Sequence, residues 1–337
     1  MAARTLDMLF KETDGVIIFP TNLILSASSG AEEAKQMINL TKPKYLLPVV
    51  GEYRHQYNMV NIAKSIDFKD ENGMSYIWNG DPAYWFGQNP LLFPIVGNLK
   101  DGKIRMDHQE YFMGRHGFAR DMDFELVSQT ETEVRYRLNS NDQTLAKYPW
   151  PFRLEIAYRL HGDSVDVIWE VTNTGEEDSY FQIGAHPAFY YPDYDPQTSE
   201  RGFLSFDRSE GLQCIRIKEK GCVDAETKYP LEIPENGLFP LAADTFDAID
   251  TIMLQDGQIG RVALHRADKT PWLSLSFNAP VVGIWSPPTK NAPFICLEPW
   301  YGRCDRAGYE GDYRDKDWVN RLAPGERFSS VYTIEIA

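Results

Sequence analysis

The sequence has few of the features on which secreted and membrane proteins depend. Its four cysteines are too few for the disulfide framework of a secreted domain, and none lies in a C-x-x-C pair of the kind used by zinc or redox sites. We therefore expect free thiols. No stretch approaches the ~20 consecutive apolar residues of a membrane span, and residues 1–7 lack the apolar segment of a signal peptide. These absences predict a cytoplasmic protein that contacts no membrane.

Positive charge is also scarce. Lys and Arg number 34 against 49 Asp and Glu, which gives a formal charge of −15. Such a chain repels nucleic acids and anionic lipid surfaces, so nucleic acid is excluded as a partner. A length of 337 residues is enough for one large core and an extension.

Long helical periods are missing from about Tyr76 onward. Apolar and polar residues alternate there with the period of half-buried strands, and Gly, Pro, Asn and Asp separate the runs. The clearest runs are residues 134–138, 154–160, 165–171, 273–277 and 332–336. Many strands joined by short turns predict an all-β protein, an antiparallel sandwich or barrel.

The first 66 residues have a different pattern. Ala34, Met37 and Ile38 share one face of a helix predicted near residues 31–40, and Pro43 follows its end. Because only the change of period marks a boundary, we divide the chain into an atypical extension (1–66) and a β-sandwich domain (67–337).

Several short segments combine His, Arg, Asp, Glu and aromatic residues with Gly and Pro, as binding loops on a rigid scaffold do. They are residues 115–121, 184–189, 247–250 and 296–302. Glu298 is the most suggestive of their members, because it follows the apolar run 294–297, where a carboxylate is costly to bury without a partner.

Each of the other candidates has a structural interpretation from the residues alone. His186, beside a proline in an apolar run, fits a hydrogen-bonded structural histidine. His116 and Arg120 fit a solvated turn with an ion pair to Asp121. Asp250 fits an exposed turn, and Trp300 fits a core position.

Motifs from about residue 73 to the end resemble the aldose 1-epimerase (galactose mutarotase) superfamily, specifically its LacX-like branch. They are YIWNGDPAYW (76–85), LFPIVG (92–97), HGFARD (116–121), IGAHPAF (183–189) and APFICLEPW (292–300), in that order. The resemblance implies an antiparallel β-supersandwich that holds a sugar in a surface cleft, and it agrees with the strand pattern.

The resemblance also implies roles for particular residues. Mutarotation needs a base at the anomeric hydroxyl and an acid at the ring oxygen, and their roles reverse on reclosure. Glu298 matches the catalytic base, His186 the general acid, and His116 a histidine that orients the substrate near the ring oxygen. The implied substrate-binding residues are Arg120, Asp250 (with Asp247 as a rival), Trp300 and Phe189. No metal or organic cofactor is implied.

The residue types suit these roles. An imidazole that titrates near 6.5 is partly protonated at neutral pH, and a nearby carboxylate would raise that fraction.

Two departures from the family pattern bear on the substrate. Asn98 stands where many relatives carry an Arg, so a cationic contact is expected to be missing or displaced. Residues 87–90 offer no charge for a phosphate, which favours an unphosphorylated aldose.

A third departure lies in the extension. Residues 26–66 are similar to the tail of metallo-β-lactamase/β-CASP ribonucleases through GAEEAKQMINL (30–40), KPKY (42–45) and PVVGEYRH (48–55). Zinc-ligating histidines of that family would stand where this chain has Ser28 and Val50, and neither side chain can replace an imidazole. A working nuclease is therefore not expected.

The sequence thus predicts an aldose 1-epimerase that interconverts the anomers of a free aldohexose, as a monomer or homodimer with a small sugar as its substrate. A non-catalytic carbohydrate-binding or sensing protein of the same fold is the alternative, kept open by Asn98 and the unusual extension.

Overall fold

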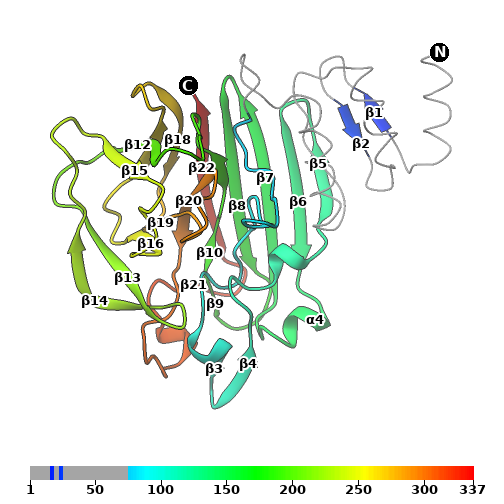
Figure 1. Cartoon of the computed structure of the whole chain (residues 1–337). Coiled ribbons are helices and arrows are strands. Elements are labelled where there is room, and N and C mark those ends of the chain that lie inside the picture. Colours follow the sequence, from blue (N-terminus) through cyan, green and yellow to red (C-terminus); the bar gives the residue numbers. More distant parts are fainter. Residues whose placement is uncertain (1–15, 19–22, 26–74) are drawn as a thin grey trace.

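The computed structural model describes residues 16–18, 23–25 and 75–337. Within them the regular secondary structure is almost entirely antiparallel strand (Figure 1), which confirms the predicted fold class. The helix predicted near 31–40 and the boundary between residues 66 and 67 lie outside the described residues. Strands β1 (Val16–Ile18) and β2 (Leu23–Leu25) pair only with each other.

One large sheet has nine strands in the order β15-β12-β17-β18-β22-β8-β7-β6-β5. The strands are β5 (Glu125–Gln129), β6 (Glu133–Asn139), β7 (Phe152–His161), β8 (Ser164–Asn173), β12 (Glu200–Phe206), β15 (Phe239–Ala242), β17 (Arg261–His265), β18 (Pro271–Phe277) and β22 (Arg327–Ile336).

A second sheet has seven strands in the order β10-β20-β19-β16-β13-β14, with β11 also paired to β20. Its members are β10 (Ile183–Gly184), β11 (Ala188–Tyr190), β13 (Gln213–Glu219), β14 (Cys222–Pro230), β16 (Thr251–Leu254), β19 (Val281–Trp285) and β20 (Phe294–Tyr301).

Smaller elements complete the described chain. Strands β3 (Lys103–Met106) and β4 (Gln109–Phe112) form a hairpin, and β9 (Ser179–Phe181) pairs with β21 (Asn320–Leu322). The helices are short: α4 (Asp142–Leu145) and the 3₁₀ turns η1 (Lys100–Gly102), η2 (Ala119–Asp121) and η3 (Tyr313–Asp315). None of the helices in the described ranges is long and apolar enough to cross a membrane.

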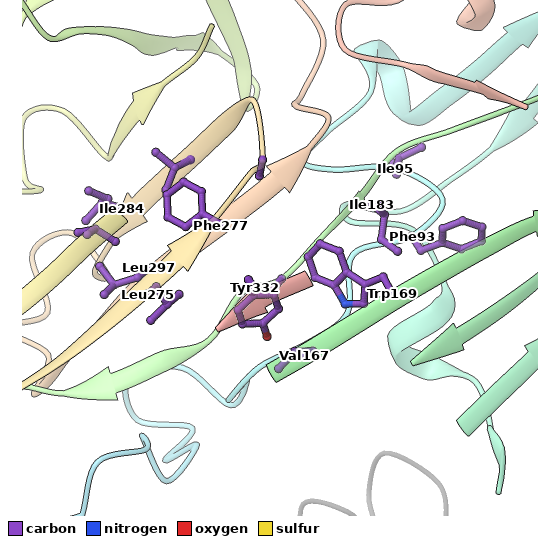
Figure 2. Packing of buried hydrophobic residues seen from close by; sticks show 14 of the residues in the cluster. Phe93, Ile95, Val167, Trp169, Ile183, Leu275, Phe277, Ile284, Leu297 and Tyr332 are labelled. Carbon is purple, nitrogen blue, oxygen red and sulfur yellow. The ribbon is translucent and has the colours of Figure 1, made fainter. Parts of the chain in front are cut away.

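The main core lies between the inner faces of the two large sheets (Figure 2). Trp169 and Tyr332 of the nine-stranded sheet and Ile284 and Leu297 of the other belong to one buried cluster. The alternation within the strands produces this layer: in β8, Val167, Trp169 and Val171 are buried, while the residues between them are partly exposed.

The strand and thiol predictions are confirmed. Each apolar run singled out in the sequence lies in a strand, namely β6, β7, β8, β18 or β22. The turn between β7 and β8 uses Gly162 at a φ of 57°, where a glycine carries no Cβ penalty. All four cysteines are free and buried.

Candidate active site

Strand β20 divides its side chains between two environments. Ile295 and Leu297 point into the core between the sheets, whereas Phe294 and Cys296 belong to a separate cluster on the opposite face. Because side chains along a strand alternate, Glu298 shares the face of Cys296. Glu298 is 1% exposed, so a carboxyl group is buried on the face of the sheet that points away from the main core.

The register of the neighbouring strands places His186 beside the carboxyl group of Glu298. Strands β10 and β11 both pair with β20, at Gly184↔Trp300 and Ala188↔Cys296, and His186 lies in the short loop between them. The indole N–H of Trp300 donates to the carbonyl oxygen of Ala185 over 3.2 Å, which anchors this loop. Residues far apart in the sequence therefore meet on one sheet face.

His186 Nε2 lies 3.2 Å from Glu298 Oε2. This is the distance of an ion pair, but the two groups are not aligned for a hydrogen bond, and Glu298 Oε2 makes none with the described part of the chain. His186 Nδ1 is also buried without a hydrogen-bond partner there. The backbone N–H of His186 donates to Oδ1 of Asn89 over 3.3 Å. The two buried atoms, Glu298 Oε2 and His186 Nδ1, therefore have unused hydrogen-bonding capacity.

Burial shifts the two pKa values in opposite directions. It lowers the pKa of His186 to about 3, with the charges of Arg120 and Arg115 adding to the effect. It raises the pKa of the Glu298 carboxyl well above its usual range, and the charge of Asp250 adds to this rise. The expectation that a nearby carboxylate would increase protonation of His186 is therefore wrong, because burial favours the neutral imidazole and the neutral carboxyl group.

His116 faces His186 from the segment after β4. The two rings are nearly perpendicular, with centroids 5.6 Å apart. The backbone N–H of Gly97 donates to His116 Nδ1 over 3.1 Å. Because a backbone N–H can only donate, Nδ1 must be the unprotonated nitrogen, and the proton of the neutral ring lies on Nε2.

Burial favours this neutral form of His116. It lowers the pKa of the imidazole well below 6.5, as do the charges of His186, Arg120 and Arg115. The residue has a φ of 67°, and its backbone N–H donates to the Gly97 carbonyl oxygen over 2.9 Å, which helps to hold this uncommon conformation.

The charges of two arginines act on both histidines. Arg115 Nε donates to Oδ1 of Asn98 over 3.2 Å, so the guanidinium group of another residue contacts the position at which a cation was expected to be missing or displaced. Arg120 donates to the Arg115 carbonyl oxygen over 3.0 Å, and its nearest Asp121 oxygen is 3.8 Å away. The ion pair between Arg120 and Asp121 is therefore long and leaves the guanidinium largely uncommitted.

The two rival aspartates have different surroundings. Oδ1 of Asp247 accepts the backbone N–H of Thr289 over 2.7 Å. Asp250 precedes β16 at a φ of 58°, accepts a bond from Thr251 Oγ1 over 3.2 Å, and lies close enough to Glu298 to raise its pKa. Of the two aspartates, Asp250 is therefore the one whose charge acts on Glu298.

Trp300 and Phe189 are buried packing residues in this structure. Trp300 is 5% exposed and its ring lies against Gly184 and Gly283, where any side chain would collide with it. Phe189 pairs with Ile295 and points into the main core, on the other face of the sheet from Glu298. Trp300 thus positions the His186 loop, and the Phe189 ring is not available to a sugar beside Glu298.

The aromatic residues around His186 are Trp85 and Trp285, whose roles the sequence did not reveal. Trp85 stacks on the imidazole with centroids 4.6 Å apart, and Trp285 meets it edge-on at 5.6 Å. The carbonyl oxygen of Trp85 accepts the indole N–H of Trp78 over 2.8 Å. The motif at 76–85 contained Trp85, but the sequence gave no sign of which side chain it would cover.

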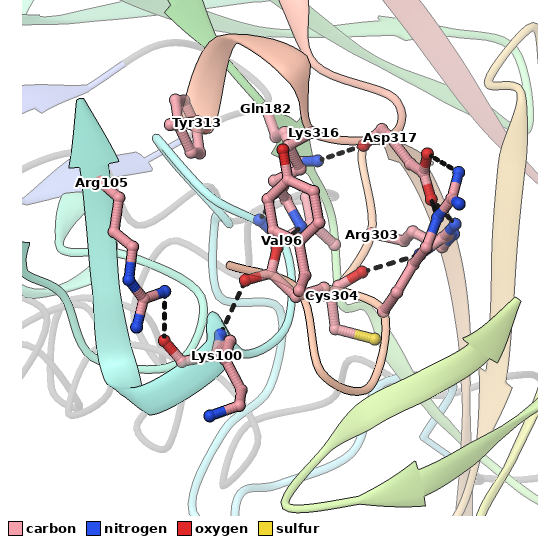
Figure 3. A network of polar contacts seen from close by, with 12 residues as sticks. Val96, Lys100, Arg105, Gln182, Arg303, Cys304, Tyr313, Lys316 and Asp317 are labelled. Carbon is pink, nitrogen blue, oxygen red and sulfur yellow. Dashed lines mark hydrogen bonds and ion pairs between the residues drawn. The ribbon is translucent and has the colours of Figure 1, made fainter. Parts of the chain in front are cut away.

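A buried polar network supports the segment that holds His116 (Figure 3). Gln182 Oε1 accepts the backbone N–H of Val96, and Gln182 Nε2 donates to the carbonyl oxygen of Asp317. Lys316 Nζ lies 2.5 Å from Asp305 Oδ1, and Asp305 Oδ2 accepts the backbone N–H of Lys100. These bonds fix residues 96–100, including the Gly97 amide that sets the tautomer of His116.

Within the described residues, one group of side chains has the composition of a metal site. Ligand atoms of His186, Cys296 and Glu298 all lie within 4.8 Å of one another, and all three residues are buried. Two of these residues form the pair described above.

Comparison with known proteins gives a consistent result for most of the chain. The family model described as aldose 1-epimerase matches residues 64–335. Protein LacX of Lactococcus lactis subsp. lactis is 32% identical over 278 residues, which is 80% of this chain and 91% of that protein.

Solved structures show the same architecture. A galactose mutarotase-like protein from Lactobacillus casei superposes with a TM-score of 0.73 at 28% identity, over 79% of this chain and 90% of that one. A galactose mutarotase related enzyme from Lactobacillus acidophilus gives 0.72 at 28% identity, over 79% and 88%.

The resemblance to ribonucleases is also found, but it is partial. Ribonuclease J2 of Bacillus subtilis is 39% identical over 99 residues, which is 29% of this chain and 18% of the ribonuclease. Because the match covers so little of the ribonuclease, it does not support ribonuclease activity for this chain.

Proposed function

Because the chain belongs to the aldose 1-epimerase family, we propose that it interconverts the α and β anomers of a free aldohexose by acid–base ring opening and reclosure. The observation that carries the proposal is the contact of His186 Nε2 with Glu298 Oε2 at 3.2 Å, in which this carboxyl oxygen has no hydrogen-bond partner within the described chain.

The pair needs a single proton to act. With one proton, one member is an acid and the other a base, whichever of the two carries the proton, and burial disfavours both the doubly protonated and the fully deprotonated pair. The pKa directions leave this proton on Glu298 before a sugar binds. We assign Glu298 as the base that takes the proton from the anomeric hydroxyl, and His186 as the acid that protonates the ring oxygen as the C1–O5 bond breaks, once sugar binding has moved the single proton from Glu298 to His186. Reclosure of the ring reverses both transfers.

His116 supplies a neutral donor beside this pair. Its Nε2–H is set by the hydrogen bond from Gly97 to Nδ1 and is free to donate to the ring oxygen or a neighbouring hydroxyl of the sugar. A donor in fixed orientation holds the sugar while C1 rotates about the C1–C2 bond in the open form.

The substrate proposed is an unphosphorylated hexose. Asp250 accepts hydrogen bonds from its hydroxyl groups and Arg120 donates to them. Trp85 and Trp285 offer the apolar faces on which sugar C–H groups stack. Arg115, held by Asn98, offers a second guanidinium on the same side. Residues 87–90 carry no charge that would pair with a phosphate group.

Polarimetry of freshly dissolved α-D-glucose and α-D-galactose tests the proposal. We expect the protein to accelerate the approach to anomeric equilibrium for at least one of them, and His186→Asn to lower that acceleration strongly. If neither sugar responds while both bind, the alternative of a non-catalytic carbohydrate-binding protein replaces the proposal.

A further inference from the structure

Cys296 is a buried nucleophilic group beside the catalytic pair that the proposed reaction does not use. Its side chain is completely buried, and its sulfur lies within 4.8 Å of the ligand atoms of His186 and Glu298. We propose that these three residues form a binding site for a thiophilic divalent cation such as Zn²⁺, and that the bound ion blocks catalysis. The inhibitory part rests on the proposed mutarotation, whereas the binding part does not.

The architecture of β20 produces this grouping. Cys296 and Glu298 are two positions apart on one strand, so both side chains leave the same face of the sheet. Cys296 pairs with Ala188 of β11 on one side, and the loop before β11 carries His186. All three ligands therefore come from two adjacent, hydrogen-bonded strands and the short connection between them.

The spacing requires only a small contraction. Ligand atoms about 2.0–2.3 Å from a tetrahedral zinc ion lie about 3.5 Å from one another. The observed limit of 4.8 Å is about an ångström too wide, so metal binding requires the side chains to rotate by that amount. His186 Nε2 and Glu298 Oε2, at 3.2 Å, are already close enough.

The donor set selects the class of metal. A thiolate, an imidazole and a carboxylate with a fourth position open suit Zn²⁺ and its analogue Co²⁺, whereas Mg²⁺ and Ca²⁺ prefer oxygen ligands throughout. Formation of the metal–sulfur bond replaces the thiol proton, which leaves to solvent, and no change of oxidation state is involved.

Glu298 loses no hydrogen bond by coordination. Its Oε2 is buried and has no hydrogen-bond partner among the described residues, and the same holds for His186 Nδ1, the ring nitrogen that does not face Glu298. Such buried unsatisfied atoms are uncommon in folded proteins. The ion would occupy the base and the acid together, so it excludes the sugar from both.

Metal binding is measured first without reference to catalysis. Titration of the metal-free protein with Co²⁺ should produce the near-ultraviolet charge-transfer absorption of a cobalt–thiolate bond at one equivalent. Competition with a zinc-binding dye should give a Zn²⁺ affinity that Cys296→Ala weakens by more than about 100-fold, since loss of a ligand exceeds the effect of an outer partner. Cys214→Ala, which removes another buried sulfur, should retain the affinity.

Inhibition is then measured with each protein compared with its own rate without metal. Zn²⁺ should slow mutarotation by the wild type in competition with sugar, a chelator should restore it, and Cys296→Ala should need far more Zn²⁺. A wild type that shows no cobalt–thiolate band, or a Zn²⁺ affinity unaffected by Cys296→Ala, overturns the metal site. A metal site that forms in a protein without mutarotation leaves the site standing and refutes the proposed function.

Discussion

His186 Nε2 and Glu298 Oε2 lie 3.2 Å apart, and each residue is more than nine-tenths buried. In this setting an imidazolium and a carboxylate are both costly, so burial pushes the two pKa values in opposite directions and favours one shared proton. In the proposed function, such a pair exchanges a proton with a bound sugar in either direction, which a reversible ring opening requires.

The pH dependence of kcat/KM follows from this sharing. Activity needs the pair with one proton, and the second proton is added with a pKa lowered from 6.5 to about 3. We therefore expect kcat/KM to stay level as the pH falls through 6.5 and to decline only far below it. The alkaline decline reports loss of the last proton, above the usual range of a carboxyl group.

Circular dichroism at each pH separates loss of activity from unfolding. An acidic decline centred near 6.5, in a protein that stays folded, would show that His186 titrates as a solvated histidine and would contradict the shared-proton account.

Trp85 should control this pH profile. Its ring stacks on His186 with centroids 4.6 Å apart and contributes to the burial that lowers the pKa of the imidazole. Trp85→Ala admits water to the ring, so the acidic decline of kcat/KM should move upward, toward 6.5. Trp85→Phe keeps an aromatic cover and should shift it less. If both variants and the wild type had the same pH profile of kcat/KM, Trp85 would have no part in lowering the pKa of His186.

Glu298 should be needed for activity but should lower the free energy of unfolding at neutral and alkaline pH. Its pKa is raised in the folded state, so the folded protein holds the proton more tightly, and the free energy of unfolding falls as the pH rises above the ordinary carboxyl value. The amide introduced by Glu298→Gln does not titrate, so the folded variant has no buried carboxyl group at this position that could ionise. At about pH 8 we expect its melting temperature to rise by about 2–4 °C, as for a gain of about 1 kcal/mol.

Scanning calorimetry at several pH values checks this, with Glu235→Gln at an exposed position as the control. The advantage of Glu298→Gln should shrink toward pH 4, where an unfolded carboxyl group also holds its proton. A variant less stable than the wild type at high pH would disprove the buried-carboxyl argument.

His116 should act as a donor and not as an acid. Its Nδ1 accepts from Gly97, which leaves Nε2–H for the sugar. His116→Ala should lower kcat/KM about 10- to 100-fold, the effect of losing a buried hydrogen bond of about 1–3 kcal/mol. His116→Gln, which keeps a donor of similar reach, should recover part of the rate. His108→Ala, an exposed histidine near β4, should match the wild type; if Gln rescues nothing, the donor role fails.

Much of the fold follows from local pattern. The alternation at Val167, Trp169 and Val171 predicts a strand with one buried face, and the structure has it in β8. The turn residues at 162–163 likewise predict the β7–β8 connection. These features depend on near neighbours in the chain, so the sequence contains them.

The site depends on register and long-range packing, which local pattern does not contain. Phe189 and Ala188 are adjacent, yet their pairing with Ile295 and Cys296 sends the phenyl ring into the main core. The choice between Asp250 and Asp247 depends on which one the turn before β16 brings toward Glu298. The low pKa of His186 depends on burial beneath Trp85, a residue distant in the sequence.

The most direct test of the central claim is saturation-transfer NMR on the anomeric protons of glucose and galactose, with the wild type and Glu298→Gln at equal concentration. We expect the wild type to exchange the two anomers of at least one sugar, and the variant to lose about 10²- to 10⁴-fold of that rate while line broadening shows that it still binds sugar. Exchange that survives Glu298→Gln unchanged would contradict the assignment of this carboxyl group as the catalytic base.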